Sequence, residues 1–295
     1  MPILNLPDVK INYLQIPQDS DSHLPKKHLV MIHGIATNLA FWYHCAQAFT
    51  ATHTVTLFDL RGHGRSSMPA TGYTPAVMAE DLKHLLDHLC IDTADFVGHS
   101  FGGSVLLHFA TLYPERVRHI VLADARLKLL QPQQKVQDWV NWQTLKPHLA
   151  QFGINLSEDN PEAGFQLLVD IARLQVNQPQ GKIPFPKTLS SIFPQGGNQR
   201  TAKKWLKLWD TTTAKEDFQT KTFLTIKQLQ QLQKPTLAIY GEKSPTLPTA
   251  AVLSEIWSHL HFQFVPNAGH FFPLSQPDFF VNKVQKFLYK SSVIN

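Results

Sequence analysis

The chain has 295 residues, of which 43% are hydrophobic and 17% are charged, a balance typical of a globular protein with a sizeable core. The net charge of +5 is mild, and no basic run or nucleic-acid motif accompanies it, so we expect no nucleic-acid partner. The N-terminus lacks the apolar length of a signal peptide, and no stretch approaches the roughly 18 apolar residues of a transmembrane helix. The default expectation is therefore a cytoplasmic protein.

The two cysteines, Cys45 and Cys90, are too few for a disulfide framework and form no CxxC pair. A cysteine-based metal site is therefore not expected, and both residues suit the role of small buried hydrophobes. The sequence indicates no metal and no cofactor.

The first third of the chain alternates strand and helix signals. A hairpin is predicted around the turn pair Pro7–Asp8. Apolar runs and helical spacing then predict, in order, strand 28–33, helix 39–51, strand 53–60, helix 75–90, strand 94–100, a helix from Phe101 to before Pro114, and strand 117–125. Strands that alternate with helices indicate an α/β protein whose mostly parallel sheet is covered by helices on both faces.

This alternation stops at about residue 127 and returns at about residue 235. The segment 127–234 predicts helices separated by Pro and Gly loops, whereas the last part predicts two more strands and a helix over about 276–290. We therefore expect a core built from 1–126 and 235–295, with 127–234 inserted between two of its strands.

The segment "VGHSFGG" holds a G-x-S-x-G pattern centred on Ser100. It follows an apolar strand and opens an apolar helix, which is the context that this motif requires. A tight strand-to-helix turn exposes the serine, and the N–H groups at the start of the helix face developing negative charge. Ser100 is therefore the candidate nucleophile, and the alternative is a tight turn with a structural role.

An oxyanion hole requires two N–H donors directed at one carbonyl oxygen. The backbone N–H of Phe101, directly after Ser100, is the first candidate. The second is the amide of Ile35, because Gly34 allows a sharp turn after the strand at 28–33. His33 is expected to shape this loop rather than to act as a base.

The chain resembles the α/β-hydrolase fold superfamily. The matching segments are "HGIATNLAFW", "FDLRGHGRSS", "FVGHSFGG", "YPERVRHIVLAD" and "NAGHFFPLSQPDFF", which appear in the family's order. The resemblance implies an eight-stranded sheet and a helical cap, or lid, inserted after the sixth strand, at the place of the segment 127–234. It covers nearly all of the chain outside that insert.

The same resemblance assigns the base and the acid. His270, in "NAGH", lies where the family has its catalytic histidine, whereas His63 and His99 are expected to pack in loops. Much of the family carries the acid after the seventh strand, where this chain has Ser244, and Glu242 lies two residues earlier. Some members, including certain haloalkane dehalogenases, carry the acid at the end of the sixth strand. That place, 24 residues after Ser100, is Asp124, which we expect within about 3.2 Å of His270; the alternative is a helix cap.

The insert carries four of the six tryptophans, in two pairs at helical spacing: Trp139, Trp142, Trp205 and Trp209. They are expected to form a core beneath the cap, and the sharper hypothesis is that some line an apolar pocket together with Phe101 and Phe271. The insert also holds 14 Lys and Arg against 8 Asp and Glu. This excess usually indicates a solvated face, but it would also suit peripheral contact with an anionic lipid surface or an acyl carrier.

The sequence therefore predicts a serine esterase or lipase-like hydrolase of a small apolar ester or acyl substrate, with lipids and thioesters among the candidates. A carboxylate nucleophile is absent at position 100, which disfavours dehalogenase and epoxide hydrolase chemistry. Two alternatives remain: hydrolysis of a C–C bond in a diketone, and a non-catalytic receptor that holds a small ligand on the same fold. The oligomeric state is open.

Overall fold

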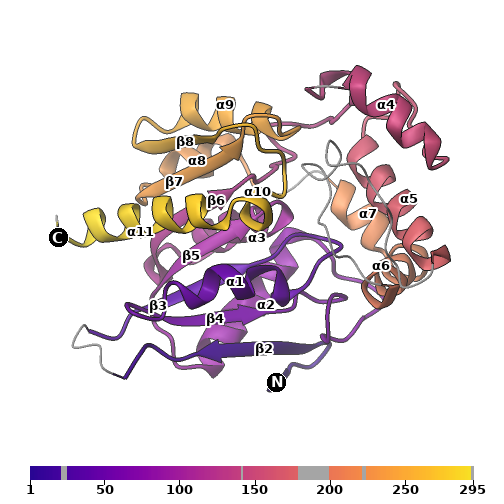
Figure 1. The fold of residues 1–295 in the computed structure, drawn as a ribbon. Helices are drawn as coiled ribbons and strands as arrows, with labels where there is room; N and C mark the ends of the chain where they lie inside the picture. Colours follow the sequence, from indigo (N-terminus) through magenta and orange to yellow (C-terminus); the bar gives the residue numbers. More distant parts are fainter. Residues whose placement is uncertain (21–24, 141, 179–198, 221–223, 294–295) are drawn as a thin grey trace.

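The structure is a computed structural model that describes residues 1–20, 25–140, 142–178, 199–220 and 224–293. Within these residues the strands form one eight-stranded sheet of order β1-β2-β4-β3-β5-β6-β7-β8 (Figure 1). The strands are β1 (Ile3–Asn5), β2 (Lys10–Ile16), β3 (His28–Ile32), β4 (Thr54–Phe58), β5 (Ala94–His99), β6 (Val117–Ala123), β7 (Thr236–Gly241) and β8 (Leu260–Val265). β1 and β2 form the predicted hairpin, and from β4 to β8 every neighbouring pair is parallel. The predicted α/β class with a mostly parallel sheet is confirmed.

Alternate residues of the central strands face opposite sides of the sheet. In β5, Phe96 packs into one hydrophobic cluster and Val97 into the other, and Val30 and Met31 of β3 divide in the same way. This period of two buries both faces of each strand. One cluster includes residues of α2 (Pro75–His88) and α3 (Phe101–Leu112), and the other includes residues of α1 (Tyr43–Gln47) and α11 (Pro277–Val293). Helices therefore cover both faces.

The predicted helix over 39–51 is too long. The structure has a 3-10 helix, η1 (Leu39–Trp42), followed by the short helix α1, which ends at Gln47. The hydroxyls of Thr50 and Thr52 donate to the carbonyls of Gln47 and Phe49, and such local bonds compete with helix continuation.

The strand predicted at 117–125 also ends early, at Ala123. Asp124 has φ of 51°, a left-handed conformation that is incompatible with a continuing strand. The chain therefore turns sharply at the edge of the sheet where the parallel strands end.

The segment between β6 and β7 is helical in its described parts, and residues 141, 179–198 and 221–223 lie outside them. Its elements are η3 (Val136–Asp138), α4 (Trp142–Gln151), α5 (Ala163–Asn177), α6 (Gln199–Thr211), α7 (Ala214–Gln219) and α8 (Ile226–Gln231). Figure 1 shows α4 to α7 gathered beside one end of the sheet, whereas α8 lies near β7 and β8. α8 is also bonded to the core, because Trp257 Nε1 donates to the Leu229 carbonyl at 2.6 Å.

The remaining helices are η2 (Pro114–Arg116), α9 (Leu247–Ile256) and α10 (Phe272–Ser275). Among the described residues, no helix combines the length and the apolarity that crossing a membrane requires.

Candidate active site

Ser100 lies on a sharp turn between β5 and α3. Its φ of 54° and ψ of −123° are unfavourable for a residue that carries a side chain. Two glycines make the turn possible: a Cβ on Gly98 would lie 2.7 Å from the Gly102 carbonyl oxygen, and a Cβ on Gly102 would lie 2.6 Å from the His33 carbonyl oxygen. The pattern around Ser100 thus has the strained geometry that the sequence predicts.

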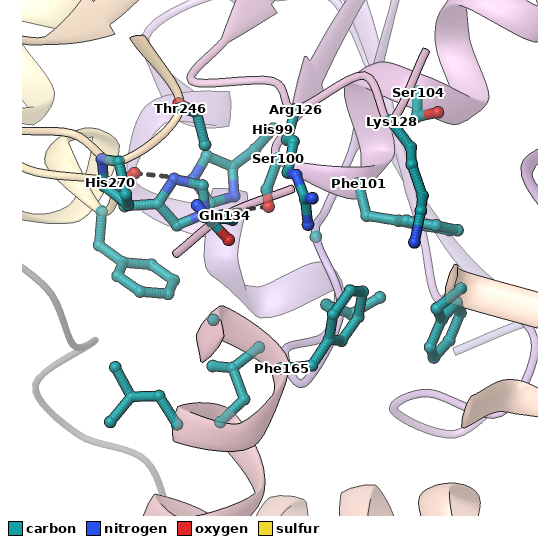
Figure 2. A pocket seen from close by; sticks show the side chains of 18 of the residues that line it. His99, Ser100, Phe101, Ser104, Arg126, Lys128, Gln134, Phe165, Thr246 and His270 are labelled. Carbon is teal, nitrogen blue, oxygen red and sulfur yellow. Dashed lines mark hydrogen bonds between the residues drawn. The ribbon is translucent and has the colours of Figure 1, made fainter. Parts of the chain in front are cut away.

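His270 lies in the loop between β8 and α10 and reaches Ser100 across the ends of the strands. Its Nε2 lies 2.9 Å from Ser100 Oγ, and its Nδ1 lies 2.8 Å from Asp124 Oδ1 (Figure 2). Because a carboxylate can accept only, the network assigns the Nδ1 hydrogen to the bond with Asp124 and leaves Nε2 to accept from the serine. The three side chains therefore form one chain of hydrogen bonds, with the Asp124 distance expected from the sequence.

Asp124 is fully buried and is held by the loop that follows β7. Gly241 donates its backbone N–H to Asp124 Oδ2 at 2.8 Å, and Thr246 donates its hydroxyl to Oδ1 at 2.5 Å. Ser244 donates its hydroxyl to the same oxygen. Such donors stabilise the ionised carboxylate, which would otherwise be costly to bury.

Ser244, at the place where the resemblance puts the acid of much of the family, serves Asp124 as a hydrogen-bond donor. Glu242, the nearby alternative, is exposed, and its Oε2 accepts from the backbone N–H of Asn267 at 2.8 Å. The structure thus brings Asp124, and not Glu242, to His270.

The two candidate oxyanion residues, Ile35 and Phe101, line the same cavity as Ser100. Phe101 is the first residue of α3. Ile35 follows Gly34, where an added Cβ would lie 3.0 Å from Ser100 Cβ. The loop after β3 therefore packs directly against the serine, so the Ile35 amide remains the second candidate donor.

His33, His63 and His99 are buried next to this site, and each donates to or bonds a backbone carbonyl. His33 Nδ1 lies 2.6 Å from the Gly34 carbonyl and its Nε2 accepts from the Leu60 amide at 3.1 Å, which fixes the loop after β3. Burial lowers the pKa of His33 to about 4. Burial, with the nearby His33, lowers the pKa of His63 to about 3, and burial, with the nearby His270, does the same for His99. All three are therefore neutral at pH 7.

The cavity at Ser100 combines an apolar lining with two cationic side chains. Its aromatic lining residues are Phe101, Trp139, Phe165, Phe218 and Phe271. Arg126 and Lys128 line it as well and point into it (Figure 2).

Of the four tryptophans of the insert, Trp139 lines this cavity. Trp142 packs with it in a separate cluster of the insert. Trp205 and Trp209 are part of the main core or lie against it. The hypothesis that tryptophans of the insert line an apolar pocket with Phe101 and Phe271 is therefore supported for Trp139.

Two groups of site residues are not singled out by the sequence. Thr246 follows Ser244 by two positions, and its bond to Asp124 spans 122 residues. Arg126, Lys128 and Glu162 come from two segments about 36 residues apart. Arg126 and Lys128 follow Asp124 closely in the chain. This proximity to a candidate site residue is the feature of the sequence that could have indicated them.

The chain is similar to several characterised hydrolases. It is 32% identical to 3-oxoadipate enol-lactonase 2 of Acinetobacter baylyi over 58% of this chain, and the match spans 64% of that enzyme. It is 24% identical to 2-(acetamidomethylene)succinate hydrolase of Mesorhizobium japonicum over 88% of this chain and 87% of that enzyme. Several of the first curated relatives are matched over less than two thirds of their length.

Solved structures show the same fold. The carboxylesterase CesB of Bacillus subtilis superimposes with a TM-score of 0.68 at 21% identity, over 97% of this chain and 90% of that one. Est816, described as an N-acyl homoserine lactone degrading enzyme, gives a TM-score of 0.66 at 23% identity, over 97% of this chain and 100% of that one. A family model described as the alpha/beta hydrolase fold matches residues 27–277, and the chain belongs to this family.

Proposed function

We propose that the protein is a serine hydrolase that cleaves a carboxylic ester through an acyl-enzyme. The observation that carries this proposal is the unbroken chain of hydrogen bonds from Asp124 through His270 to Ser100. A serine next to an oriented imidazole is the arrangement that activates a hydroxyl for attack. The names of two relatives, an enol-lactonase and a succinate-derivative hydrolase, describe hydrolysis, which agrees with this chemistry.

In the first half of the reaction, Ser100 Oγ bonds to the ester carbonyl carbon while its proton passes to His270 Nε2. The carbonyl oxygen becomes an oxyanion, which the backbone N–H groups of Ile35 and Phe101 stabilise. Asp124 holds the imidazole in the required tautomer and stabilises its positive charge. The proton then passes to the leaving alcohol oxygen as the C–O bond breaks.

In the second half, a water molecule attacks the acyl carbon. His270 takes a proton from the water and returns it to Ser100 Oγ when the acyl bond breaks, which releases the carboxylic acid. In this scheme His270 transfers the protons, Asp124 positions the imidazole, and the amides of Ile35 and Phe101 stabilise the oxyanion.

We propose further that the segment 127–234 serves as a cap over Ser100, apart from α8, which contacts the core. Trp139, Phe165 and Phe218 of this segment line the same cavity as Ser100. An apolar cover of this kind would exclude water from the oxyanion and would select the substrate.

The test combines a fluorophosphonate probe, which labels activated serines, with 4-nitrophenyl esters of increasing acyl length. We expect labelling and turnover by the wild type, and neither by Ser100→Ala. Ligand binding without labelling or turnover would instead indicate a receptor on this fold.

A further inference from the structure

Two cations and one carboxylate form a cluster in the wall of the cavity at Ser100. Arg126 and Lys128 lie in the loop after β6, and Glu162 lies directly before α5. Glu162 Oε2 accepts from Arg126 Nη1 at 2.7 Å, and its Oε1 accepts from Lys128 Nζ at 2.7 Å. All three side chains are largely buried, with exposed fractions of 12%, 17% and 10% for Arg126, Lys128 and Glu162.

The cluster has a net charge of +1, and its cations are on the cavity side. Arg126 and Lys128 line the cavity, whereas Glu162 is absent from the described lining residues, which include no Asp or Glu. An excess charge of this kind is expensive beside aromatic side chains unless an anion balances it. An unexplained positive charge in the wall of a candidate substrate cavity therefore calls for an anionic ligand.

The hydrogen bonds of the cluster leave donors available on the cavity side. Lys128 Nζ carries three hydrogens, and within the described residues it has one partner, Glu162. Arg126 gives Nε and Nη2 to the Gln131 carbonyl, and Nη1 and Nη2 to Glu162. This leaves two Nζ hydrogens and one Nη1 hydrogen for a ligand.

Glu162 is held in place independently of any ligand. Its backbone N–H donates to Asn160 Oδ1 at 2.9 Å, and it forms a β-bridge with Gln134. The backbone N–H of Gln134 donates to the backbone carbonyl of Pro161 at 2.7 Å. The cations are therefore presented by a rigid support, as a binding site requires.

We propose that Arg126 and Lys128 bind a carboxylate group of the substrate, so that the protein prefers esters that also carry a free carboxylate. One carboxylate balances the net charge of +1 and accepts hydrogen bonds from both cations, which are of the strong charge-assisted type. The inference rests on the proposed hydrolase function, since it names the class of substrate for the same Ser100.

The kinetic test compares esters that carry a free carboxylate with partners in which that carboxylate is methylated and therefore neutral. For the acyl side, 4-nitrophenyl hydrogen adipate is compared with methyl 4-nitrophenyl adipate. For the alcohol side, 3-acetoxybenzoate is compared with methyl 3-acetoxybenzoate. The readout is the ratio of kcat/KM for the acidic ester to kcat/KM for its neutral partner, which we expect to exceed about ten in the wild type in at least one pair.

Three variants test the charge of the cluster. Lys128→Gln brings the net charge to zero while Arg126 still pairs with Glu162, and we expect the ratio to fall about tenfold. Lys128→Arg keeps the charge and should keep the ratio, whereas Glu162→Gln raises the net charge to +2 and should raise the ratio. If Glu162→Gln does not fold, the comparison of the two Lys128 variants decides alone.

The matched control is Lys146→Gln. Lys146 is a lysine of the same insert with an exposed fraction of 54%, paired with Glu158 at 2.8 Å, and it is not among the described lining residues. Its loss should leave the ratio unchanged. A ratio near one for the wild type in both pairs, or an equal fall in Lys146→Gln and Lys128→Gln, would overturn the inference.

A binding measurement separates this inference from the proposed function. Calorimetry with the Ser100→Ala protein compares monomethyl adipate with dimethyl adipate. We expect the acid, monomethyl adipate, to bind more tightly, and we expect Lys128→Gln in the same background to abolish this difference in affinity. If no ester is cleaved, the proposed function fails and this comparison still decides the inference. If neutral esters are cleaved and the acid shows no advantage in either measurement, the inference fails alone.

Discussion

The hydroxyl of Ser244 donates to Oδ1 of Asp124, across a sequence separation of 120 residues. Ser244 stands where much of the family has its acid, and Asp124 stands at the end of the neighbouring strand. Asp124 directly follows β6, the neighbour of β7 in the sheet, and the Ser244 hydroxyl is one of the donors to its carboxylate. His270 Nδ1 lies 2.8 Å from the same oxygen.

The proposed role of Asp124 as the acid is tested by Asp124→Asn. Asparagine tolerates the φ of 51° at this position, so the turn should persist while the charge that stabilises the imidazolium is lost. We expect kcat to fall on the order of 10²–10⁴-fold, measured with a 4-nitrophenyl ester. Glu242→Gln is the control, because its carboxylate bonds the Asn267 amide; a comparable loss there would refute the assignment.

Ser244→Asp in the Asp124→Asn background should restore part of the lost activity. The side chain at 244 already contacts the place of the Asp124 carboxylate, so a carboxylate there would lie near His270. Steady-state rates of the single and double variants measure the recovery. A double variant no faster than Asp124→Asn would show that position 244 no longer reaches the imidazole.

Ser100→Ala should abolish probe labelling and ester hydrolysis without unfolding the protein. The substitution removes one hydroxyl and no core volume, so the melting temperature should change by little. A variant that kept most of its turnover would exclude Ser100 as the nucleophile.

Comparison of Trp139 with Trp142 tests whether the insert contributes to substrate selection. Their ring centroids lie 6.0 Å apart in one buried cluster, but Trp139 lines the cavity at Ser100 and Trp142 is not among the lining residues. Each alanine variant should lose roughly 3–5 kcal/mol of stability. Trp139→Ala should in addition change the acyl-length preference, and an identical change in Trp142→Ala would contradict the lining role.

The buried histidines predict that stability falls in mild acid. Burial lowers the pKa of His63 to about 3, below the ordinary value near 6.5, so below pH 6.5 the unfolded chain binds the proton more readily. Between pH 6.5 and pH 5 this linkage costs about 2 kcal/mol for such a histidine. Urea titrations across this range should show a shallower pH dependence for His63→Gln, and an unchanged slope would contradict the prediction.

The sequence predicts most of the sheet and the position of Ser100 because these depend on local patterns. Apolar runs define the strands. The two glycines around Ser100 indicate a sharp turn, because a side chain at either position would collide with nearby backbone. The placement of Asp124 came from its distance to Ser100 together with the family resemblance. Its geometry is as expected, with Asp124 Oδ1 2.8 Å from His270 Nδ1.

The partners of these residues were not predictable, because they come from remote segments. Thr246 and Asp124 meet because β6 and β7 are adjacent in the sheet. Glu162 meets Arg126 because the insert packs against the loop after β6, and the helical periodicity of the insert does not predict how it packs on the core. The helix predicted over 39–51 failed for a different reason. There, the hydroxyls of Thr50 and Thr52 bond backbone carbonyls just beyond the end of α1, which apolar spacing does not reveal.

The attachment of Asp124 to the loop after β7 also has a consequence for the order of folding. The segment from β2 to Asp124, the residue directly after β6, is contiguous in the chain and contains Ser100. The donors to the Asp124 carboxylate, however, arrive with Gly241, Ser244 and Thr246. Closing a loop of more than 100 residues is a slow, non-local event. We therefore expect the Asp124 carboxylate to remain hydrated until β7 docks beside β6. His270, which follows β8, should join Asp124 and Ser100 only when the sheet is complete.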